Sequence, residues 1–108
     1  MDQNGPDAVM WWLKAANQGN VDAQMGLGFA FAEGKIVPKD DLSAANWWRA
    51  AADRGNLDAQ FNLGMLYYNG INGKPDYRSA AFWLKNASDK GHSNAKTYMN
   101  IMKEKGLL

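Results

Sequence analysis

A 36-residue repeat runs through the whole chain and restricts the folds open to it. The segment Trp47–Gly64, WWRAAADRGNLDAQFNLG, closely resembles Trp11–Gly28, 36 residues earlier, and more loosely resembles Trp83–Asn100, 36 residues later. Several positions keep their residue in all three copies: Ala8/Ala44/Ala80, Trp11/Trp47/Trp83, Ala15/Ala51/Ala87, Gly19/Gly55/Gly91, Ala23/Ala59/Ala95 and Gly34/Gly70/Gly106. Self-similarity at one fixed period in the thirties is typical of stacked helix pairs.

We therefore predict an all-α protein, an α/α right-handed superhelix, or solenoid, of three antiparallel helix pairs. The 108 residues are expected to form one domain with units of about 1–36, 37–72 and 73–108, because three units are about the minimum for a continuous core. Amphipathic periodicity and glycine stops predict six helices and no strands. The helices are expected at about 7–18, 42–54, 58–69, 77–90 and 93–105, and from an N-cap at Asn20 to about Glu33.

Two glycines occupy the same mid-helix phase in successive units. Gly28 and Gly64 each cost a helix about 1 kcal/mol relative to alanine, so we expect a neighbouring helix to cross closely at each. Asn100 stands at this phase in the last copy, which suits a terminal helix with no successor stacked on it.

Composition and charge exclude several classes of function. Twelve basic and eleven acidic residues give a net charge of +1 without a block of either sign, which favours neither nucleic acid nor a membrane surface. Cysteine is absent. No apolar run approaches the length of a membrane span, and the first residues lack the pattern of a leader. The sequence as written predicts a soluble, cytoplasmic protein, or a periplasmic or secreted one if a leader was removed.

The repeat unit resembles the Sel1-like repeat, a helix-pair family related to the tetratricopeptide repeat and common in bacteria. The matching residues of the second copy are Ala44-Ala45, Trp47-Trp48, Ala51-Ala52, Gly55-Asn56, Asp58-Ala59-Gln60, Leu63-Gly64, Tyr67 and Gly70. The third copy departs from the pattern at His92, Asn94, Lys96 and Asn100. The family's unit is normally written from the glutamine-containing helix, whereas this chain opens on the tryptophan-containing one. The resemblance implies a non-catalytic adaptor or regulator.

Groups suited to catalysis are few. The single histidine, His92, lies in a predicted turn, and no metalloprotease, nucleophile-elbow, phosphate-loop or calcium-loop motif occurs. We predict no enzyme activity, no cofactor and no metal site. The alternative is a ligand-binding or catalytic module in which carboxylates such as Glu33 and Asp40 converge. The five tryptophans are predicted to serve the core, because Trp11 and its equivalents lie on the alanine stripe.

A partner-binding face is predicted on the second helix of each unit. Phe29, Met65 and Ile101 occupy one phase there, opposite the core stripe, on the helix expected to line the concave wall of such a solenoid. Packing between repeats is the alternative role. The predicted partner-binding residues are Phe29, Glu33, Asn62, Met65, Tyr68, Asn69, Tyr98 and Ile101. The predicted function is a scaffold that binds a partner protein or peptide, as a regulator or as a neutraliser of an effector.

The amino-terminal helix is predicted to carry a second interface. Val9, Met10 and Leu13, beside Trp12, form an apolar strip on a helix that no earlier unit covers. Terminal repeats usually present a polar outer face, so we expect this strip to be buried in a homodimer or against further repeats. The alternative function is therefore a structural subunit, or part of a longer array, that assembles through this face.

Overall fold

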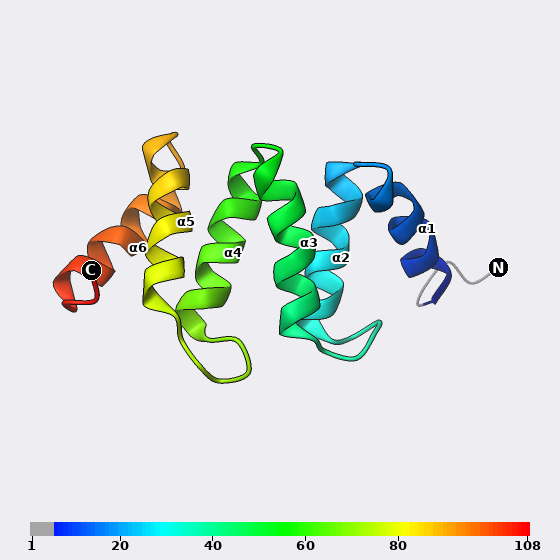
Figure 1. Cartoon of the computed structure of the whole chain (residues 1–108), viewed down its shortest axis with the longest axis horizontal. Coiled ribbons are helices and arrows are strands. Elements are labelled where there is room, and N and C mark those ends of the chain that lie inside the picture. Colours follow the sequence, from blue (N-terminus) through cyan, green and yellow to red (C-terminus); the bar gives the residue numbers. More distant parts are fainter. Residues whose placement is uncertain (1–5) are drawn as a thin grey trace.

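The computed structural model describes the backbone of residues 6–108 and the side chains from Val9 onward, and this part of the chain forms six helices (Figure 1). Their bounds are α1 Pro6–Asn17, α2 Val21–Glu33, α3 Asp41–Asp53, α4 Leu57–Asn69, α5 Tyr77–Asp89 and α6 Ser93–Glu104. Residues 6–108 contain no strand, only an isolated bridge between Ile71 and Lys74. The predicted all-α solenoid is confirmed, with every predicted helix end within one residue of the observed one.

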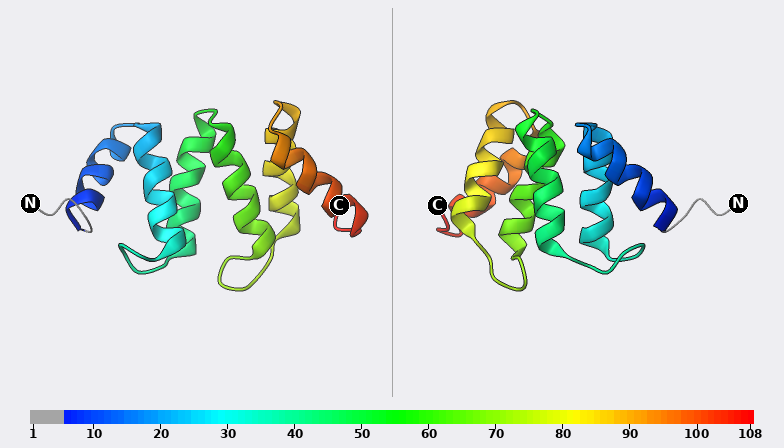
Figure 2. Two further views of the ribbon diagram at one scale, coloured as in Figure 1. Left: turned by 180° about the vertical axis from the view of Figure 1, so that it is seen from behind. Right: turned by 45° about the vertical axis from the view of Figure 1, so that its right-hand side comes forward.

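The helices follow one another along an elongated molecule. The molecule measures 50 × 28 × 18 Å, with α1 and α6 at opposite ends of its long axis (Figure 1). Two further views show the same succession of helices (Figure 2). Extensive contacts join only helices that are consecutive in the chain, and they are most extensive between α2 and α3 and between α4 and α5. Each unit is thus held by its nearest neighbours alone, as in other solenoids.

Equivalent side chains begin the second helix of each unit. Asn20, Asn56 and His92 are the N-caps of α2, α4 and α6, and each side chain accepts a hydrogen bond from the backbone N–H three residues on, at 2.9, 2.8 and 3.1 Å. These bonds satisfy a donor that a helix start leaves unpaired. His92, which the sequence places in a turn, is the N-cap of α6. At the other end of α2, Gly34 adopts the left-handed conformation with φ 71°, which glycine allows without steric cost.

The two mid-helix glycines are the crossing points predicted from their phase. A Cβ at Gly28 would overlap the indole ring of Trp48 on α3. A Cβ at Gly64 would lie 2.8 Å from Cγ of Leu84 on α5. We call Gly28 and Gly64 the glycine seats, because each receives a large side chain of the following helix. At Asn100, the equivalent position on α6, the side chain is exposed.

The core lies between consecutive helices in three clusters. One joins α1 to α2, the next lies around α3, α4 and Trp83, and the last joins α5 to α6. The largest fully buried side chains are Leu27, Leu63, Leu84 and Met102. Two buried glutamines add polar links between these helices: Nε2 of Gln24 and of Gln60 donates to the backbone carbonyl eight residues earlier, at 3.1 and 3.3 Å. Each of these carbonyls, of Ala16 and Ala52, also accepts a backbone N–H from the turn that follows its helix, at 3.0 and 2.9 Å.

Candidate interaction site

A groove between α2, α3 and α4 brings together three of the residues predicted to contact a partner, Asn62, Met65 and Asn69. It has a volume of about 310 Å³. The full lining consists of Ala32, Lys39, Asp41, Trp48, Asn62, Met65, Leu66, Asn69 and Gly70. We call this depression the α4 groove. The sequence places Trp48 in the core and Asp40 or Asp41 at the start of α3, but it does not single out Lys39, because the place of Lys39 at the groove depends on how the loop before α3 folds.

The charges at the α4 groove are paired with each other. Nζ of Lys39 lies 2.9 Å from Oδ1 of Asp41 and donates to the carbonyl of Ala32 at 2.8 Å. Oδ2 of Asp41 accepts a longer bond, of 3.5 Å, from the backbone N–H of Asn72 in the next loop. Among residues 6–108, the structure gives the side-chain amides of Asn62 and Asn69 no hydrogen bond. The groove therefore combines an apolar floor and a neutralised ion pair with two amides that are free to bind.

The other predicted partner residues do not line the α4 groove. Phe29 is 44% exposed and packs edge-on against Trp48, with ring centroids 5.3 Å apart. Glu33 is exposed near the end of α2, and Ile101 is half-buried on α6. Phe29, Met65 and Ile101 occupy equivalent positions in the three units, but they lie in three different environments. The side chains that surround this position differ from unit to unit.

Tyr68 and Tyr98 form part of an aromatic cluster between α4, α5 and α6. The ring centroids of Tyr68 and Tyr98 are 5.9 Å apart, and those of Tyr68 and Tyr77 are 5.8 Å apart. The Tyr68 hydroxyl also accepts a long bond, of 3.4 Å, from Nζ of Lys105. The predicted residues Tyr68 and Tyr98 thus contact each other. Tyr77, at the first position of α5, was missed, and its helix-start position gave no signal of this contact.

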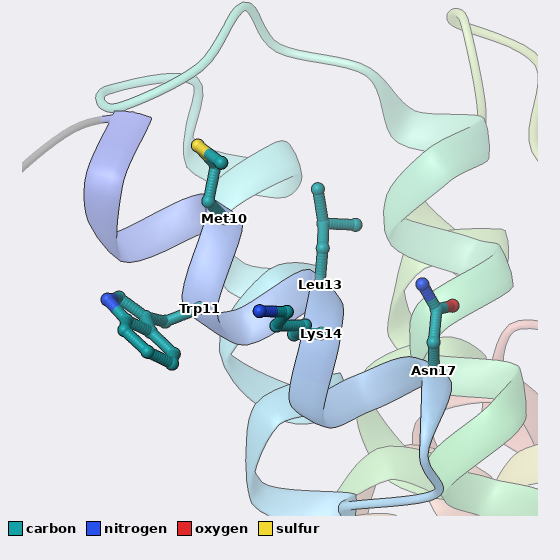
Figure 3. Close-up of a pocket in the computed structure, with 5 residues that line it drawn as sticks. All are labelled: Met10, Trp11, Leu13, Lys14 and Asn17. Carbon is teal, nitrogen blue, oxygen red and sulfur yellow. The ribbon is translucent and has the colours of Figure 1, made fainter.

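The exposed side of α1 carries a second candidate surface. Met10, Trp11, Leu13, Lys14 and Asn17 line a hollow of about 440 Å³ on this helix (Figure 3). Met10 and Trp11 are 67% and 69% exposed, and Figure 3 shows the Trp11 ring projecting away from its helix. We call these five residues the α1 face. Met10 and Leu13 were predicted in this place.

Two predictions about α1 need correction. Val9 is buried, because its side chain points to α2 and joins the cluster with Ala16 and Leu27; it does not belong to the open strip. Trp11, predicted as a core residue, is exposed. Its equivalents Trp47 and Trp83 pack against the clusters of the preceding units, and among the described residues Trp11 has no such cluster to join.

Asp40, one of the two carboxylates of the alternative catalytic hypothesis, caps a helix, and so does Asp76. Asp40, rather than Asp41, caps α3: its Oδ2 accepts from the Ser43 hydroxyl at 2.9 Å and its Oδ1 from two backbone N–H groups. The hydroxyl and backbone N–H of Ser43 hold the pKa of Asp40 below its usual value. Backbone and hydroxyl bonds from Ser79 lower the pKa of Asp76 in the same way. These ionised caps have their oxygens occupied, so Asp40 does not present a free carboxylate to Glu33.

Two kinds of feature do not occur within residues 6–108. No group of three or more histidine or acidic side chains that could hold a metal ion occurs within them. None of the helices they form is both long and apolar enough to cross a membrane.

Comparison with a family model identifies the repeat. The Sel1 repeat model matches residues 1–20, 21–56 and 57–92. The second and third matches begin at the first residues of α2 and α4, so the family's unit pairs α2 with α3 and α4 with α5. These boundaries lie half a unit away from those expected at 36 and 72. Within residues 1–20, the structure describes only α1, the second helix of a family unit.

Solved structures give the same result. A Sel1 repeat protein from Oxalobacter formigenes matches 98% of the chain at 30% identity with a TM-score of 0.85. A protective antigen of uropathogenic Escherichia coli strains, which displays an SLR fold, matches 93% at 32% identity with a TM-score of 0.85. The chain spans 44% and 21% of these two proteins. No curated protein matches it.

Proposed function

We propose, from the premise that this chain belongs to the Sel1 repeat family, that it is a non-catalytic scaffold that binds a partner protein or peptide in the α4 groove. Sel1 repeat proteins are in general scaffolds for protein interaction. The proposal for this chain rests on one observation: the side-chain amides of Asn62 and Asn69, on either side of Met65, make no hydrogen bond within residues 6–108.

The chemistry of the groove suits an extended peptide segment. Asn62 and Asn69 are seven residues apart on α4, which corresponds to about 10.5 Å along a helix, and about three residues of extended chain cover this distance. Each amide can donate to a peptide carbonyl and accept from a peptide N–H. Met65 between them offers an adaptable apolar contact for one side chain. The Lys39–Asp41 pair leaves little net charge, so the segment that fits is uncharged at its centre.

The test compares groove variants with a matched surface variant. Affinity capture from the native organism supplies a partner, whose affinity for purified parent and variant chains is then measured by calorimetry. We expect Asn62→Ala and Asn69→Ala each to weaken binding by about tenfold, and Met65→Ser by a similar factor, because truncation of a central contact typically costs 1–2 kcal/mol or more. Asn46→Ala, at an exposed asparagine of α3, is the control and should bind as the parent does.

The helical circular-dichroism spectrum should remain unchanged in all four variants. Unaltered affinity in the three groove variants would place the binding surface elsewhere. The aromatic cluster is then the next surface to test, with Tyr68→Ser, because Tyr68 was predicted as a partner contact and lies beside the groove on α4.

Self-assembly through the α1 face is the second candidate function. It is favoured by the exposure of Met10 and Trp11, since large apolar side chains that lie together on a surface often mark an interface. Light scattering over a concentration series, on the parent and on Leu13→Glu, separates this function from the first. A parent that remains monomeric throughout would rule out homodimerisation.

A further inference from the structure

The loop between α4 and α5 contains an asparagine in a backbone conformation that few residues adopt (Figure 1). Ile71 and Lys74 form an isolated bridge, and the Lys74 N–H donates to the Ile71 carbonyl at 3.1 Å, which closes a tight turn. Asn72 and Gly73 are the central residues of this turn, with φ 54° and 81°. Positive φ at both central positions is the mark of a type I′ turn. Among residues 6–108, Asn72 is the one non-glycine residue with positive φ.

The peptide group between Asn72 and Gly73 is unrestrained. In the part of the chain that the structure describes, neither the Asn72 carbonyl nor the Gly73 N–H makes a hydrogen bond. Both residues are exposed, and a Cβ at Gly73 would have no atom within 4 Å. Turns of types I′ and II′ share a φ of about 60° at the first central residue and differ by a rotation of this peptide group. Because glycine takes either sign of φ, the turn can pass from type I′ to type II′ without losing the hydrogen bond that closes it.

This rotation brings a nucleophile to the side chain of Asn72. In the type II′ form the Gly73 nitrogen lies on the same side of the Cα–C bond of Asn72 as its Cβ, so that the nitrogen can reach Cγ. Ring closure forms a bond from the Gly73 nitrogen to Cγ and breaks the Cγ–Nδ2 bond. The proton of the Gly73 amide passes through solvent to the departing ammonia, and a cyclic imide remains.

Water then opens the imide at one of its two carbonyl groups. Attack at Cγ gives aspartate, and attack at the main-chain carbonyl gives isoaspartate, in which the main chain runs through Cβ and Cγ. In sum, the asparagine amide and one water become a carboxylate and ammonium. The sequence of steps uses no oxidant, reductant or cofactor.

A second asparagine–glycine pair, three residues earlier, is held in place. Asn69 is the last residue of α4, and the N–H of Gly70 donates to the Leu66 carbonyl at 2.9 Å. A Cβ at Gly70 would lie 3.0 Å from backbone atoms of Lys74 and Pro75. The peptide group between Asn69 and Gly70 therefore cannot rotate without breaking the end of the helix.

We propose that Asn72 is a site of spontaneous covalent modification, deamidation to aspartate and isoaspartate, and that the turn selects it over Asn69. The product carries a new negative charge beside Asp41, whose Oδ2 accepts the Asn72 N–H at 3.5 Å. Isoaspartate also lengthens the main chain within the turn, so the hydrogen bond from Lys74 to Ile71 is lost. This inference goes beyond the proposed function and does not depend on any partner in the α4 groove.

The test compares the two asparagines in the folded and the unfolded parent. The purified chain is incubated at physiological temperature in mildly alkaline buffer made with heavy-oxygen water, with and without urea. Peptide mapping by mass spectrometry then gives the conversion rate at each site, and the heavy label marks conversion that occurred during incubation. In the folded chain Asn72 should convert at least about tenfold faster than Asn69, because ring closure at Asn69 must first break a helix hydrogen bond. In urea the two rates should be comparable.

The two conditions separate the effect of the turn from that of the sequence. A folded chain in which Asn72 converts no faster than Asn69 would overturn the proposal. The same tenfold preference in urea would overturn it too, since the sequence alone would then select Asn72. The matched variant is Asn72→Gly, because glycine keeps the positive φ of the turn. This variant should lose the fast conversion, whereas Asn4, which lies outside the described residues and is followed by glycine, should convert as in the parent.

A second measurement tests the effect of the modification on the turn. Each conversion lowers the net charge of +1 by one unit, so ion exchange separates the converted chains from the parent. Amide exchange measured by nuclear magnetic resonance should be faster at Lys74 in the isoaspartate form. Asn72→Asp, which keeps the length of the main chain, is the control and should exchange at Lys74 as the parent does. An isoaspartate form whose Lys74 amide exchanges at the parent's rate would overturn the predicted loss of the turn.

Discussion

Two glycines of α2 that lie two residues apart should respond in opposite directions to alanine. At Gly28, an added Cβ would overlap the Trp48 indole, with Cε2 only 2.6 Å away. At Gly26, the nearest atom to an added Cβ is Cε2 of Trp12 at 3.5 Å, an ordinary van der Waals contact. Both substitutions add one methyl group to the same helix. The difference between their effects on the free energy of unfolding therefore reports how closely α3 crosses α2.

The expected magnitudes follow from these contacts. Alanine is favoured over glycine in a helix interior by about 1 kcal/mol, so Gly26→Ala should raise the free energy of unfolding by up to that amount. Gly28→Ala has the same favourable effect on helix propensity, but the added methyl group forces a buried indole to move. Overpacking of a core typically costs 1–3 kcal/mol. The ring is rigid and the added Cβ would overlap three of its atoms, so we expect a cost near the upper end of this range. We expect a net loss of about 2 kcal/mol.

The measurement is urea and thermal unfolding followed by helical circular dichroism. In a domain of this size, about 1 kcal/mol corresponds to at least 4 °C, so the melting temperature should rise by about 4 °C in Gly26→Ala and fall by about 8 °C in Gly28→Ala. A Gly28→Ala variant as stable as the parent would refute the glycine seat.

A double-mutant cycle identifies the obstacle. Leucine stands at position 84 where Trp48 stands in the preceding unit, so Trp48→Leu is a substitution that the repeat already tolerates at this phase. In the Gly28→Ala background, Trp48→Leu should cost less than it does alone, since the smaller side chain relieves the overlap. Strict additivity of the two changes would mean that some group other than Trp48 limits position 28.

Three further predictions concern the helix caps. Asn56→Ala should lower the free energy of unfolding by about 1 kcal/mol in a denaturant titration, because the Ala59 N–H loses its acceptor, whereas Asn56→Asp should not. Hydrogen bonds from Ser43 hold the pKa of Asp40 below its usual value of 3.8, so the contribution of this cap to stability is present at neutral pH and is lost as the pH falls below about 4. In Asp40→Asn the free energy of unfolding should therefore depend less on pH over that range. A variant whose stability falls with acid as steeply as the parent's would contradict the assignment. His92→Ala should destabilise the chain by about 1 kcal/mol, while His92→Asn, which restores the residue type of the other two units, should unfold at nearly the parent's urea midpoint.

Features that depend on local sequence were predictable. The caps at Asn20 and Asn56 act within three residues of the chain, and a period of 36 residues repeats their signal, so helix ends could be placed to within one residue. The crossing at the glycine seats was also predictable, because a residue that costs helix stability at the same phase in two units needs a reason in packing.

Features that depend on which neighbour is present were not predictable in the same way. Trp11 occupies the same position in the repeat as Trp47 and Trp83. Side chains at this position are buried by the preceding unit, and the position alone does not show whether such a unit is packed there. Val9 was misplaced for a related reason: periodicity defines an apolar stripe without showing which of its edges meets α2. The ion pair of Lys39 with Asp41 arises from a loop conformation that no periodic pattern encodes.

The restriction of extensive contacts to consecutive helices has a consequence for how the chain folds and opens. Contacts that are close in sequence cost little loop-closure entropy, so folding should be fast for a chain of this length. Partial opening should start at the ends, because α1 and α6 each make extensive contacts with one helix only, whereas α3 and α4 each make them with two. Amide hydrogen exchange would then follow a gradient along the solenoid, slowest in α3 and α4 and faster toward both ends. A ligand on the α1 face would slow exchange at that end first.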